Sequence, residues 1–403
     1  MSSDSLKRKL EFLYSLYSRG IKLGLRNVAD FLKKLKNPQN YFPAIHIAGT
    51  NGKGSVSHMI AATLMHAGYR VGLYTSPHLL RFNERIRVNN KMISDSDIME
   101  FTEKNWNYIK GQKVTFFEVT TAMAFEFFRK KRVDIAVLET GMGGRLDATR
   151  LCNPILTIIT HIGLDHLEYL GRTLKQVARE KLGVVRRGIP LVIGNIPQEA
   201  ISTIKMSCRK NGVPILFSRA IKIKEIGVQP PFQIINKKTV LKAIKYLKNV
   251  GFNILDKHIE KGLNTLPPCR FMKLGRKPVI ITDVSHNPDG FAELNKSLKK
   301  FYKGRRIIFI IGIMKDKNIP SMARKLPGKG NVYIITKPNV ERAAEPEYIA
   351  SFFDPSLKVF TVSDIRKALR KARALAGRDD IICICGSFYT VGEALRILKV
   401  KVT

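Results

Sequence analysis

Strand-like apolar runs alternate with helix-like segments along most of this chain. Such alternation predicts an α/β fold with mainly parallel sheets. Polar motifs follow several of these runs, and open α/β sheets bind ligands at the carboxyl ends of their strands. The predicted strands are 44–48, 71–74, 133–138, 155–160, 190–194, 213–217, 278–282, 306–311, 331–336, 357–361 and 381–385.

A break in this pattern falls at Leu266-Pro267-Pro268-Cys269-Arg270. Two prolines cannot continue a helix and favour an extended linker. We therefore expect an NTP-binding domain over residues 1–266 and a smaller, Rossmann-like α/β domain over residues 267–403.

A glycine-rich loop follows the first predicted strand and opens a helix-like run. It reads Gly49-Thr50-Asn51-Gly52-Lys53-Gly54-Ser55. Backbone N–H groups and a helix N-terminus can hold phosphates there, with Lys53 at the outer phosphates and Ser55 facing Mg²⁺. The extra Gly54 between Lys53 and Ser55 departs from the common GxxxxGK[ST] spacing.

Two further polar clusters follow predicted strands in the first domain. Residues 74–87 mix a hydroxyl group, His78, Glu84 and three arginines, which is also compatible with a solvated loop. Glu139 comes directly after an apolar strand. A buried carboxylate needs a cation, and Mg²⁺ beside the phosphate loop would serve, although a helix N-cap is the alternative.

Residues 163–183 contain a third cluster. His166 stands near a strand end and is a candidate metal ligand. Lys181 shares one face of a predicted helix with Leu174, Val177 and Val184, where a lysine usually extends its ammonium to water.

The fourth cluster lies in the second domain. Arg270 precedes a strand that ends in Asp283-Val284-Ser285-His286-Asn287-Pro288. Residues 312–317 and 386–392 belong to the same group. An Asp and a His at a strand end can hold the ribose or phosphates of a nucleotide.

Composition and charge exclude several classes of protein. The 403 residues are 44% hydrophobic and 25% charged, which is typical of a globular protein without membrane spans. The N-terminal residues read as the first helix of the fold rather than a cleavable signal, so we expect a cytoplasmic protein.

The five scattered cysteines fit reduced thiols. The net charge of +38 permits nucleic-acid binding, but Lys and Arg are spread along the chain and no nucleic-acid motif is present.

The order of these motifs resembles that of folylpolyglutamate synthase/dihydrofolate synthase, a branch of the Mur-ligase superfamily. The resemblance runs from about Gly20 to about Gly392. The glycine-rich loop indicates the superfamily, while TSPHLLRFNERIRV, ETGMGGRLDAT and the LDH segment point to the folate branch. It implies a Mur-ligase-like P-loop domain carrying folate-binding loops, followed by a glutamate-ligase domain.

The resemblance also implies an activity. ATP phosphorylates the carboxylate of a folate or dihydropteroate, and the amino group of L-glutamate attacks the acyl phosphate, releasing ADP and phosphate. It further implies a monomer with two Mg²⁺ ions and small-molecule partners, with neither membrane nor nucleic acid among them.

By position, the resemblance assigns roles around the nucleotide. It implies metal ligation by Ser76 and Glu139 at a first Mg²⁺ and by His166 at a second. It implies carbamylation of Lys181, which would turn a buried ammonium into an anion that suits a cation. The residues implied at the nucleotide are Asn51, Gly52, Lys53, Gly54, Ser55, Gln233, Asn236, Arg270, Asp283 and His286.

The implied substrate-binding residues are His78, Arg81, Arg85 and Ser387, with Ser387 near glutamate. The sequence departs from the family pattern where Val284 replaces a glycine, Cys269 replaces another, and Phe232 replaces a His. The segment between Phe217 and Gln233 is also short. These changes affect the adenine side rather than the chemistry. The alternatives are a Mur-type ligase for another carboxylate, a P-loop kinase, and a basic nucleic-acid-binding protein with a vestigial NTP fold.

Overall fold

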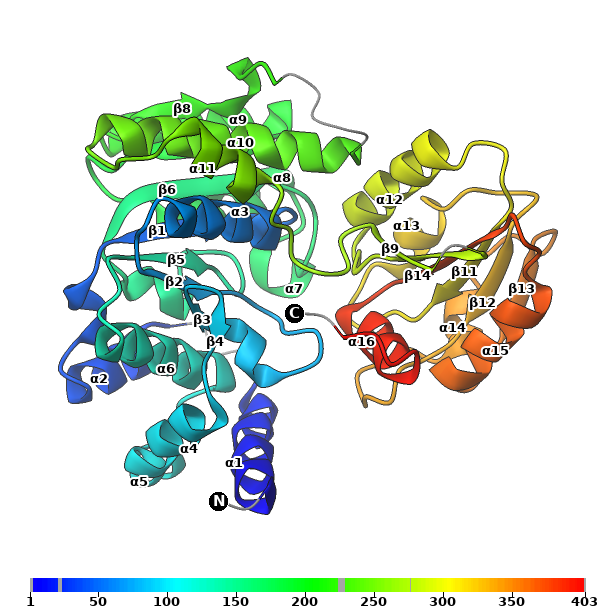
Figure 1. Cartoon of the computed structure of the whole chain (residues 1–403), viewed down its shortest axis with the longest axis horizontal. Helices are drawn as coiled ribbons and strands as arrows, with labels where there is room; N and C mark the ends of the chain where they lie inside the picture. The colour runs from blue at the N-terminus through cyan, green and yellow to red at the C-terminus, as the bar shows by residue number, and fades with distance from the viewer. Residues whose placement is uncertain (1–2, 21–23, 224–228, 276, 402–403) are drawn as a thin grey trace. The chain divides into compact units, whose positions relative to one another are not determined.

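The computed structural model describes residues 3–20, 24–223, 229–275 and 277–401, which form two compact units (Figure 1). The first unit contains Met1–Ile162, Thr173–Ile223 and Ile235–Thr265. The second contains Gly163–Arg172, Lys224–Ile234 and Leu266–Thr403. His166 and Gln233 therefore belong to the second unit.

Sheet A of the first unit has the strand order β4-β3-β2-β5-β1-β6-β7-β8. All neighbouring pairs are parallel except β2–β3 and β3–β4. Strand β1 is buried along its whole length, as expected for a central parallel strand covered on both faces. The strands are β1 (Ala44–Ala48), β2 (Val71–Tyr74), β3 (Ile86–Val88), β4 (Lys91–Met92), β5 (Ile135–Glu139), β6 (Pro154–His161), β7 (Leu191–Asn195) and β8 (Ile215–Phe217).

Helices cover both faces of sheet A. Figure 1 shows α3, α10 and α11 on one face and α2 and α6 on the other. Helix α6 begins with a capping box in which Thr115 and Glu118 bond each other's backbone N–H groups. The helices of this unit are α1 (Ser3–Ser15), α2 (Arg26–Lys34), α3 (Lys53–His66), α4 (Asp95–Lys104), α5 (Trp106–Gly111), α6 (Phe116–Lys130), α8 (Leu174–Lys181), α9 (Gln198–Lys210), α10 (Pro231–Asn249) from Ile235 onward, and α11 (Asp256–Leu263).

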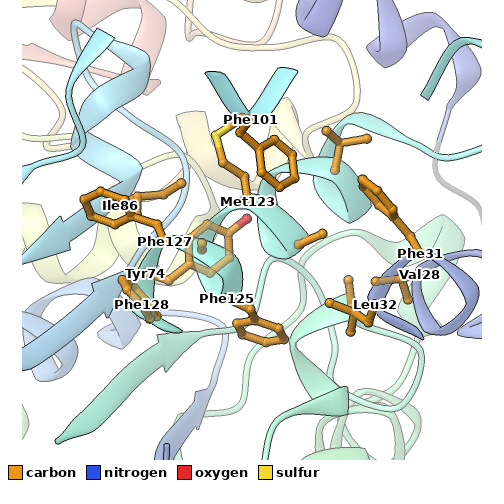
Figure 2. Close-up of a cluster of buried hydrophobic side chains, with 14 of the residues drawn as sticks. Val28, Phe31, Leu32, Tyr74, Ile86, Phe101, Met123, Phe125, Phe127 and Phe128 are labelled. Carbon is orange, nitrogen blue, oxygen red and sulfur yellow. The ribbon is translucent and has the colours of Figure 1, made fainter. Parts of the chain in front are cut away.

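An aromatic-rich core fills the space between sheet A and the helices α1, α2, α4 and α6 (Figure 2). Tyr74, Phe31 and Phe125 are fully buried there. Burying large apolar side chains is the main source of stability of such a layer. This core holds the carboxyl ends of β2 and β5, which carry the polar motifs, in a fixed position.

Sheet B of the second unit has the order β13-β12-β11-β14-β10-β9, and only β9 is antiparallel to its neighbour. Helices α12 and α13 lie on one side, with α15 and α16 on the other (Figure 1). The elements are α7 (Leu167–Leu170), β9 (Met272–Leu274), β10 (Val279–Thr282), α12 (Pro288–Phe301), β11 (Ile307–Ile311), α13 (Ile319–Ala323), β12 (Val332–Ile335), α14 (Pro346–Ala350), β13 (Lys358–Thr361), α15 (Ile365–Leu375), β14 (Ile381–Cys385) and α16 (Phe388–Ile397).

The predicted α/β class with mainly parallel sheets is confirmed, and each predicted strand overlaps an observed one. Strands β3, β4 and β9 were not predicted. All three are antiparallel, and each is two or three residues long with charged positions. Such strands lack the continuous apolar run that marks a buried parallel strand. No helix among the described residues is long and apolar enough to cross a membrane.

Candidate functional site

The glycine-rich loop joins β1 to α3, as its pattern predicts. Gly49 has a φ of 156° and Gly52, the N-cap of α3, a φ of 87°, both in the region that favours glycine. A Cβ on Gly49 would lie 2.0 Å from Thr160 Oγ1, so any other residue there would force Thr160 or the loop to shift. The ammonium of Lys53 donates to the carbonyl oxygens of Gly49 at 2.9 Å and Thr50 at 3.4 Å.

A buried carboxylate lies at the same edge of sheet A. Glu139 ends β5 and pairs in register with Ile47 of β1, two residues before Gly49. Its side chain is 4% exposed, and the backbone N–H of Ser76 donates to Glu139 Oε2 at 3.4 Å. The structure therefore brings together the two predicted ligands of a first metal ion.

The atoms around Glu139 fit a magnesium ion. Mg²⁺ prefers oxygen ligands, and both Glu139 and Ser76 offer them. Thr140 follows Glu139, and its hydroxyl is buried with no hydrogen-bond partner among the described residues. A buried oxygen without a partner is uncommon and is consistent with a cation or its water nearby.

The loop after β2 is organised around Glu84. Its carboxylate accepts hydrogen bonds from the backbone N–H groups of Leu79, Leu80 and Arg81 at 2.7–2.8 Å. These bonds satisfy the backbone of a tight loop that contains a cis peptide between Ser76 and Pro77. Glu84 thus shapes the loop that carries the predicted substrate-binding residues.

Arg85 and His78 are brought together inside this loop. Arg85 is 3% exposed, and its Nε donates to His78 Nδ1 at 2.8 Å. Because Nδ1 accepts this bond, neutral His78 carries its proton on Nε2. The side chain of Arg81 instead turns to Asp95 at 3.2 Å and is exposed, so the structure does not group it with the other two.

Aromatic residues from distant segments complete the surroundings of Arg85. Its guanidinium lies 5.1 Å from the centre of the Phe116 ring and donates to the Tyr17 hydroxyl at 3.2 Å. The rings of Tyr17 and Phe116 stack with centres 4.1 Å apart. Sequence reasoning missed both aromatics, because nothing in the local pattern of an N-terminal helix or of a helix start marks them as neighbours of Arg85.

A buried polar chain lies beneath the loop after β5. Asp147 accepts from the backbone N–H of Met142 at 2.9 Å and from the Thr149 hydroxyl at 2.5 Å. The Thr149 oxygen is then available to accept from His46 Nε2 at 2.8 Å. Burial lowers the pKa of His46 to about 3, so its ring is neutral at neutral pH. These bonds hold the glycine-rich stretch 141–144 in place.

Lys181 ends α8 and is only 2% exposed, so its ammonium does not extend to water as lysines on apolar faces usually do. The backbone of Lys181 touches the loop after β5, since a Cβ on Gly144 would come within 2.9 Å of its carbonyl oxygen. The structure thus places the side chain of Lys181 inside the protein, at the end of α8.

Asp165 is the centre of a charged cluster in the second unit. Its carboxylate lies 2.7 Å from Lys317 Nζ, 3.2 Å from Asn287 Nδ2 and 3.7 Å from His286 Nε2. Lys317 Nζ is also 3.5 Å from His166 Nε2. Burial alone would raise the pKa of Asp165, but these cationic and histidine neighbours hold it well below its usual range.

His286 and Asp283 stand at the end of β10. The Nδ1–H of His286 donates to the Val284 carbonyl at 2.9 Å, which leaves the lone pair on Nε2. Burial lowers the pKa of His286 to about 4, so the ring is neutral. Asp283 accepts from the backbone N–H groups of Phe271 and Ser285, each at 2.8 Å, and burial raises its pKa.

The remaining predicted residues take the following positions. Arg270 lies over the Phe388 ring at 5.3 Å, and the centre of the His286 ring lies 5.8 Å from the centre of the same Phe388 ring. Ser387 caps α16, and its hydroxyl accepts from the backbone N–H of Thr390 at 3.0 Å. Gln233 is buried in the second unit. Asn236 belongs to the first unit. Its side chain lies against the glycine-rich loop, because a Cβ added to Gly52 would come within 2.5 Å of Asn236 Oδ1.

Two family models match the chain. The Mur ligase middle domain matches residues 47–225, and the Mur ligase glutamate ligase domain matches residues 269–388. The folylpolyglutamate synthase of Lacticaseibacillus casei is 32% identical over 407 residues, covering 93% of this chain and 94% of that protein. A probable bifunctional folylpolyglutamate synthase/dihydropteroate synthase of Haloferax volcanii is 31% identical over 420 residues and covers 96% of this chain, which spans only 49% of that relative.

Solved structures give the same result. Mycobacterium tuberculosis folylpolyglutamate synthase complexed with ADP and AMPPCP superposes with a TM-score of 0.89 at 26% identity, covering 99% of both chains. A bifunctional folylpolyglutamate synthase/dihydrofolate synthase with Mn, AMPPNP and L-glutamate bound has a TM-score of 0.84 at 28% identity, covering 97% of this chain and 98% of the other.

Proposed function

Because this chain belongs to the folylpolyglutamate synthase/dihydrofolate synthase family of the Mur-ligase superfamily, we propose that it adds L-glutamate to a folate or dihydropteroate carboxylate using ATP. One observation carries this proposal. The Gly49–Ser55 loop and the buried Glu139 lie at the same edge of sheet A, at the ends of paired strands. A phosphate loop beside an oxygen-rich cation site is what phosphoryl transfer to a carboxylate requires.

The reaction has two chemical steps. A carboxylate oxygen of the acceptor attacks the γ-phosphorus of ATP, forming an acyl phosphate and ADP. The amine of L-glutamate then attacks the acyl carbon, and inorganic phosphate leaves with the former C–O bonding electrons. Both steps need charge neutralisation and alignment more than covalent help from the protein. The relatives with bound nucleotide analogue, manganese and L-glutamate support this scheme.

We propose the following roles for the residues assigned to the nucleotide. Lys53 neutralises the outer phosphates within the loop of Asn51, Gly52, Gly54 and Ser55, whose N–H groups and helix start suit an anion. Ser76 and Glu139 would hold a Mg²⁺ ion, which would supply charge neutralisation, and His166 is proposed as a ligand of a second ion. Arg270 and His286 are proposed at the γ-phosphate, with Asp283, Gln233 and Asn236 toward the nucleoside.

The acceptor is proposed to bind at Arg85 and His78, with Arg81 at the edge of the loop. A guanidinium and an Nε2–H donor side by side suit an anionic acceptor, and the adjoining Tyr17–Phe116 stack suits a flat aromatic body. Ser387 is proposed near L-glutamate. Its hydroxyl also caps α16, so the proposed L-glutamate site would lie at the N-terminus of that helix.

Lys181 is proposed to be carbamylated. The neutral amine adds to CO₂ and releases one proton, which yields a carbamate anion in place of a buried ammonium. Equilibration with ¹³C-bicarbonate should give a carbamate carbon signal in the NMR spectrum of the wild-type protein but not of Lys181→Ala. Full activity of Lys181→Ala, or the same carbamate signal in the spectra of the wild type and Lys181→Ala, would contradict carbamylation of Lys181.

The decisive experiment measures ADP release with ATP, Mg²⁺ and L-glutamate and either dihydropteroate or tetrahydrofolate as acceptor. Acceptor-dependent ADP and a glutamylated product with at least one acceptor are expected, and the pair of assays distinguishes one activity from two. Lys53→Ala serves as the inactive control. Absence of both products with both acceptors would refute the proposed function. We also propose that the protein is a monomer and is located in the cytoplasm. Light scattering tests the monomeric state.

A further inference from the structure

Thr160 is a buried residue near the end of β6 that lies against the glycine-rich loop. It is 3% exposed, and its hydroxyl donates to the carbonyl oxygen of Asn51 at 2.7 Å, although 109 residues separate the two. The backbone N–H of Thr50 donates to the His161 carbonyl at 2.9 Å. The loop is therefore attached to the end of β6 at two successive residues.

The bond from Thr160 fixes the direction of a peptide group. A trans peptide is planar, so its C=O and N–H point in opposite directions. The Asn51 carbonyl points to Thr160, and the Gly52 N–H of the same peptide therefore points away from β6. Phosphate-binding loops work because their N–H groups, not their carbonyl oxygens, face the anion.

The glycine at position 49 follows from the same contact. A Cβ on Gly49 would lie 2.0 Å from the Thr160 hydroxyl oxygen, whereas one on Gly52 would lie 2.5 Å from Asn236 Oδ1 and at an ordinary contact distance of 3.5 Å from Thr160 Cβ. The Gly49 carbonyl also accepts from Lys53 at 2.9 Å. Thr160 thus lies against Gly49 and bonds to the Asn51 carbonyl, in the turn that precedes Lys53.

We propose that Thr160 is a positioning residue for the nucleotide phosphates, acting by holding the Asn51–Gly52 peptide with its N–H toward the anion. This inference rests on the proposed function, because it requires that the loop bind a nucleotide. Without the hydroxyl, the Asn51 carbonyl loses this donor, and the peptide is no longer held in one orientation. Binding of the phosphates should then weaken, while the proposed acceptor and glutamate contacts, which do not involve Thr160, remain.

The test compares Thr160→Val, which replaces the hydroxyl by a methyl group of similar size, with Thr160→Ser, which keeps the hydroxyl. Thr157→Val is the matched control, because Thr157 is buried on the same strand and its hydroxyl donates to the Pro190 carbonyl at 3.0 Å. The measurements are the Kd of ADP by calorimetry, kcat and KM for ATP and L-glutamate, and Tm without nucleotide.

Thr160→Val should raise the Kd of ADP and the KM of ATP roughly three- to tenfold, the usual size of one lost hydrogen bond. The KM of L-glutamate should not change, and Thr160→Ser should restore nucleotide binding. Thr157→Val should keep wild-type nucleotide constants even if its Tm falls. If Thr160→Val does not fold, Thr160→Ala is measured in the same way.

Wild-type nucleotide constants in Thr160→Val or Thr160→Ala would overturn the inference, as would equal effects of Thr160→Val and Thr157→Val. These outcomes presuppose an active wild-type enzyme. A wild-type protein that binds ADP but forms no glutamylated product would refute the proposed function and still allow the calorimetric comparison.

Discussion

The carboxylate of Asp165 and the ammonium of Lys317 lie 2.7 Å apart, with their side chains 8% and 5% exposed. The residues are 152 positions apart in the sequence and meet within the second unit. A buried ion pair is favourable only when the remaining lone pairs and N–H groups of both partners are also hydrogen-bonded. Asn287 Nδ2 supplies a further donor to Asp165 at 3.2 Å. The pair therefore ties the 163–172 segment to the loop after β11.

Removing one member of this pair should be far more harmful than removing both. Lys317 Nζ also lies 3.6 Å from Asp316 Oδ2, but Asp165→Asn removes the nearer, buried carboxylate and should lower the free energy of unfolding by about 3 kcal/mol. Asp165→Asn combined with Lys317→Met should recover part of that loss. Urea unfolding of the wild type, the single variants Asp165→Asn and Lys317→Met, and the double variant gives the coupling energy. The exposed pair Lys337–Glu345, also 2.7 Å apart, is the control and should couple by less than about 1 kcal/mol. Equal coupling in the two pairs would contradict this prediction.

Arg85→Met should weaken binding of the acceptor and leave ATP binding unchanged. A charged hydrogen bond contributes about 1.5–3 kcal/mol, so the acceptor KM should rise roughly ten- to hundredfold. Steady-state kinetics with each substrate varied in turn measures both constants. Arg129→Met is the matched control, because Arg129 also lies over an aromatic ring, that of Tyr41 at 5.5 Å. A rise in the ATP KM of Arg85→Met equal to that of the acceptor KM would contradict the assignment.

Stability should fall as the pH decreases from about 6.5 toward about 3, partly because of His46. Burial lowers the pKa of His46 from its ordinary value of 6.5 to about 3. In this range the unfolded chain binds a proton that the folded protein excludes, so protonation favours unfolding. Urea unfolding across this range should show a shallower pH dependence for His46→Gln. The control for the substitution itself is His66→Gln, at a histidine that is exposed. Identical slopes in all three proteins would rule out this role.

Gly262→Ala should destabilise the first unit, although alanine normally stabilises a helix by roughly 0.5–1 kcal/mol relative to glycine. A Cβ on Gly262 of α11 would lie 2.0 Å from Thr63 Oγ1 and 2.7 Å from Thr63 Cα in α3. The two helices would have to separate. Gly111→Ala is the control, because nothing lies within 4 Å of a Cβ there. Thermal unfolding should show a lower Tm for Gly262→Ala only, and an unchanged or higher Tm would disprove this close packing.

Much of the fold is readable from local pattern. Residues 381–385 are a continuous apolar run, and residues 44–48 are apolar except for His46, because parallel strands buried on both faces require such runs. The antiparallel strands at residues 86–88 and 272–274 were missed, since each contains a charged residue and no apolar run. For such strands the pairing partner, rather than the strand's own sequence, decides the structure.

The sequence by itself determined the class of fold and the glycine-rich loop, because periodicity, glycine spacing and the Lys53 position act between close neighbours in the chain. Only the tertiary structure decided that Tyr17 and Phe116 meet Arg85, and that Thr160 holds the Asn51 carbonyl. These contacts join segments separated by 31 to 109 positions, and sheet order and helix packing bring them together. A hydrogen bond or ring contact of this kind leaves no periodic trace in the sequence, because its partners share only a place in space.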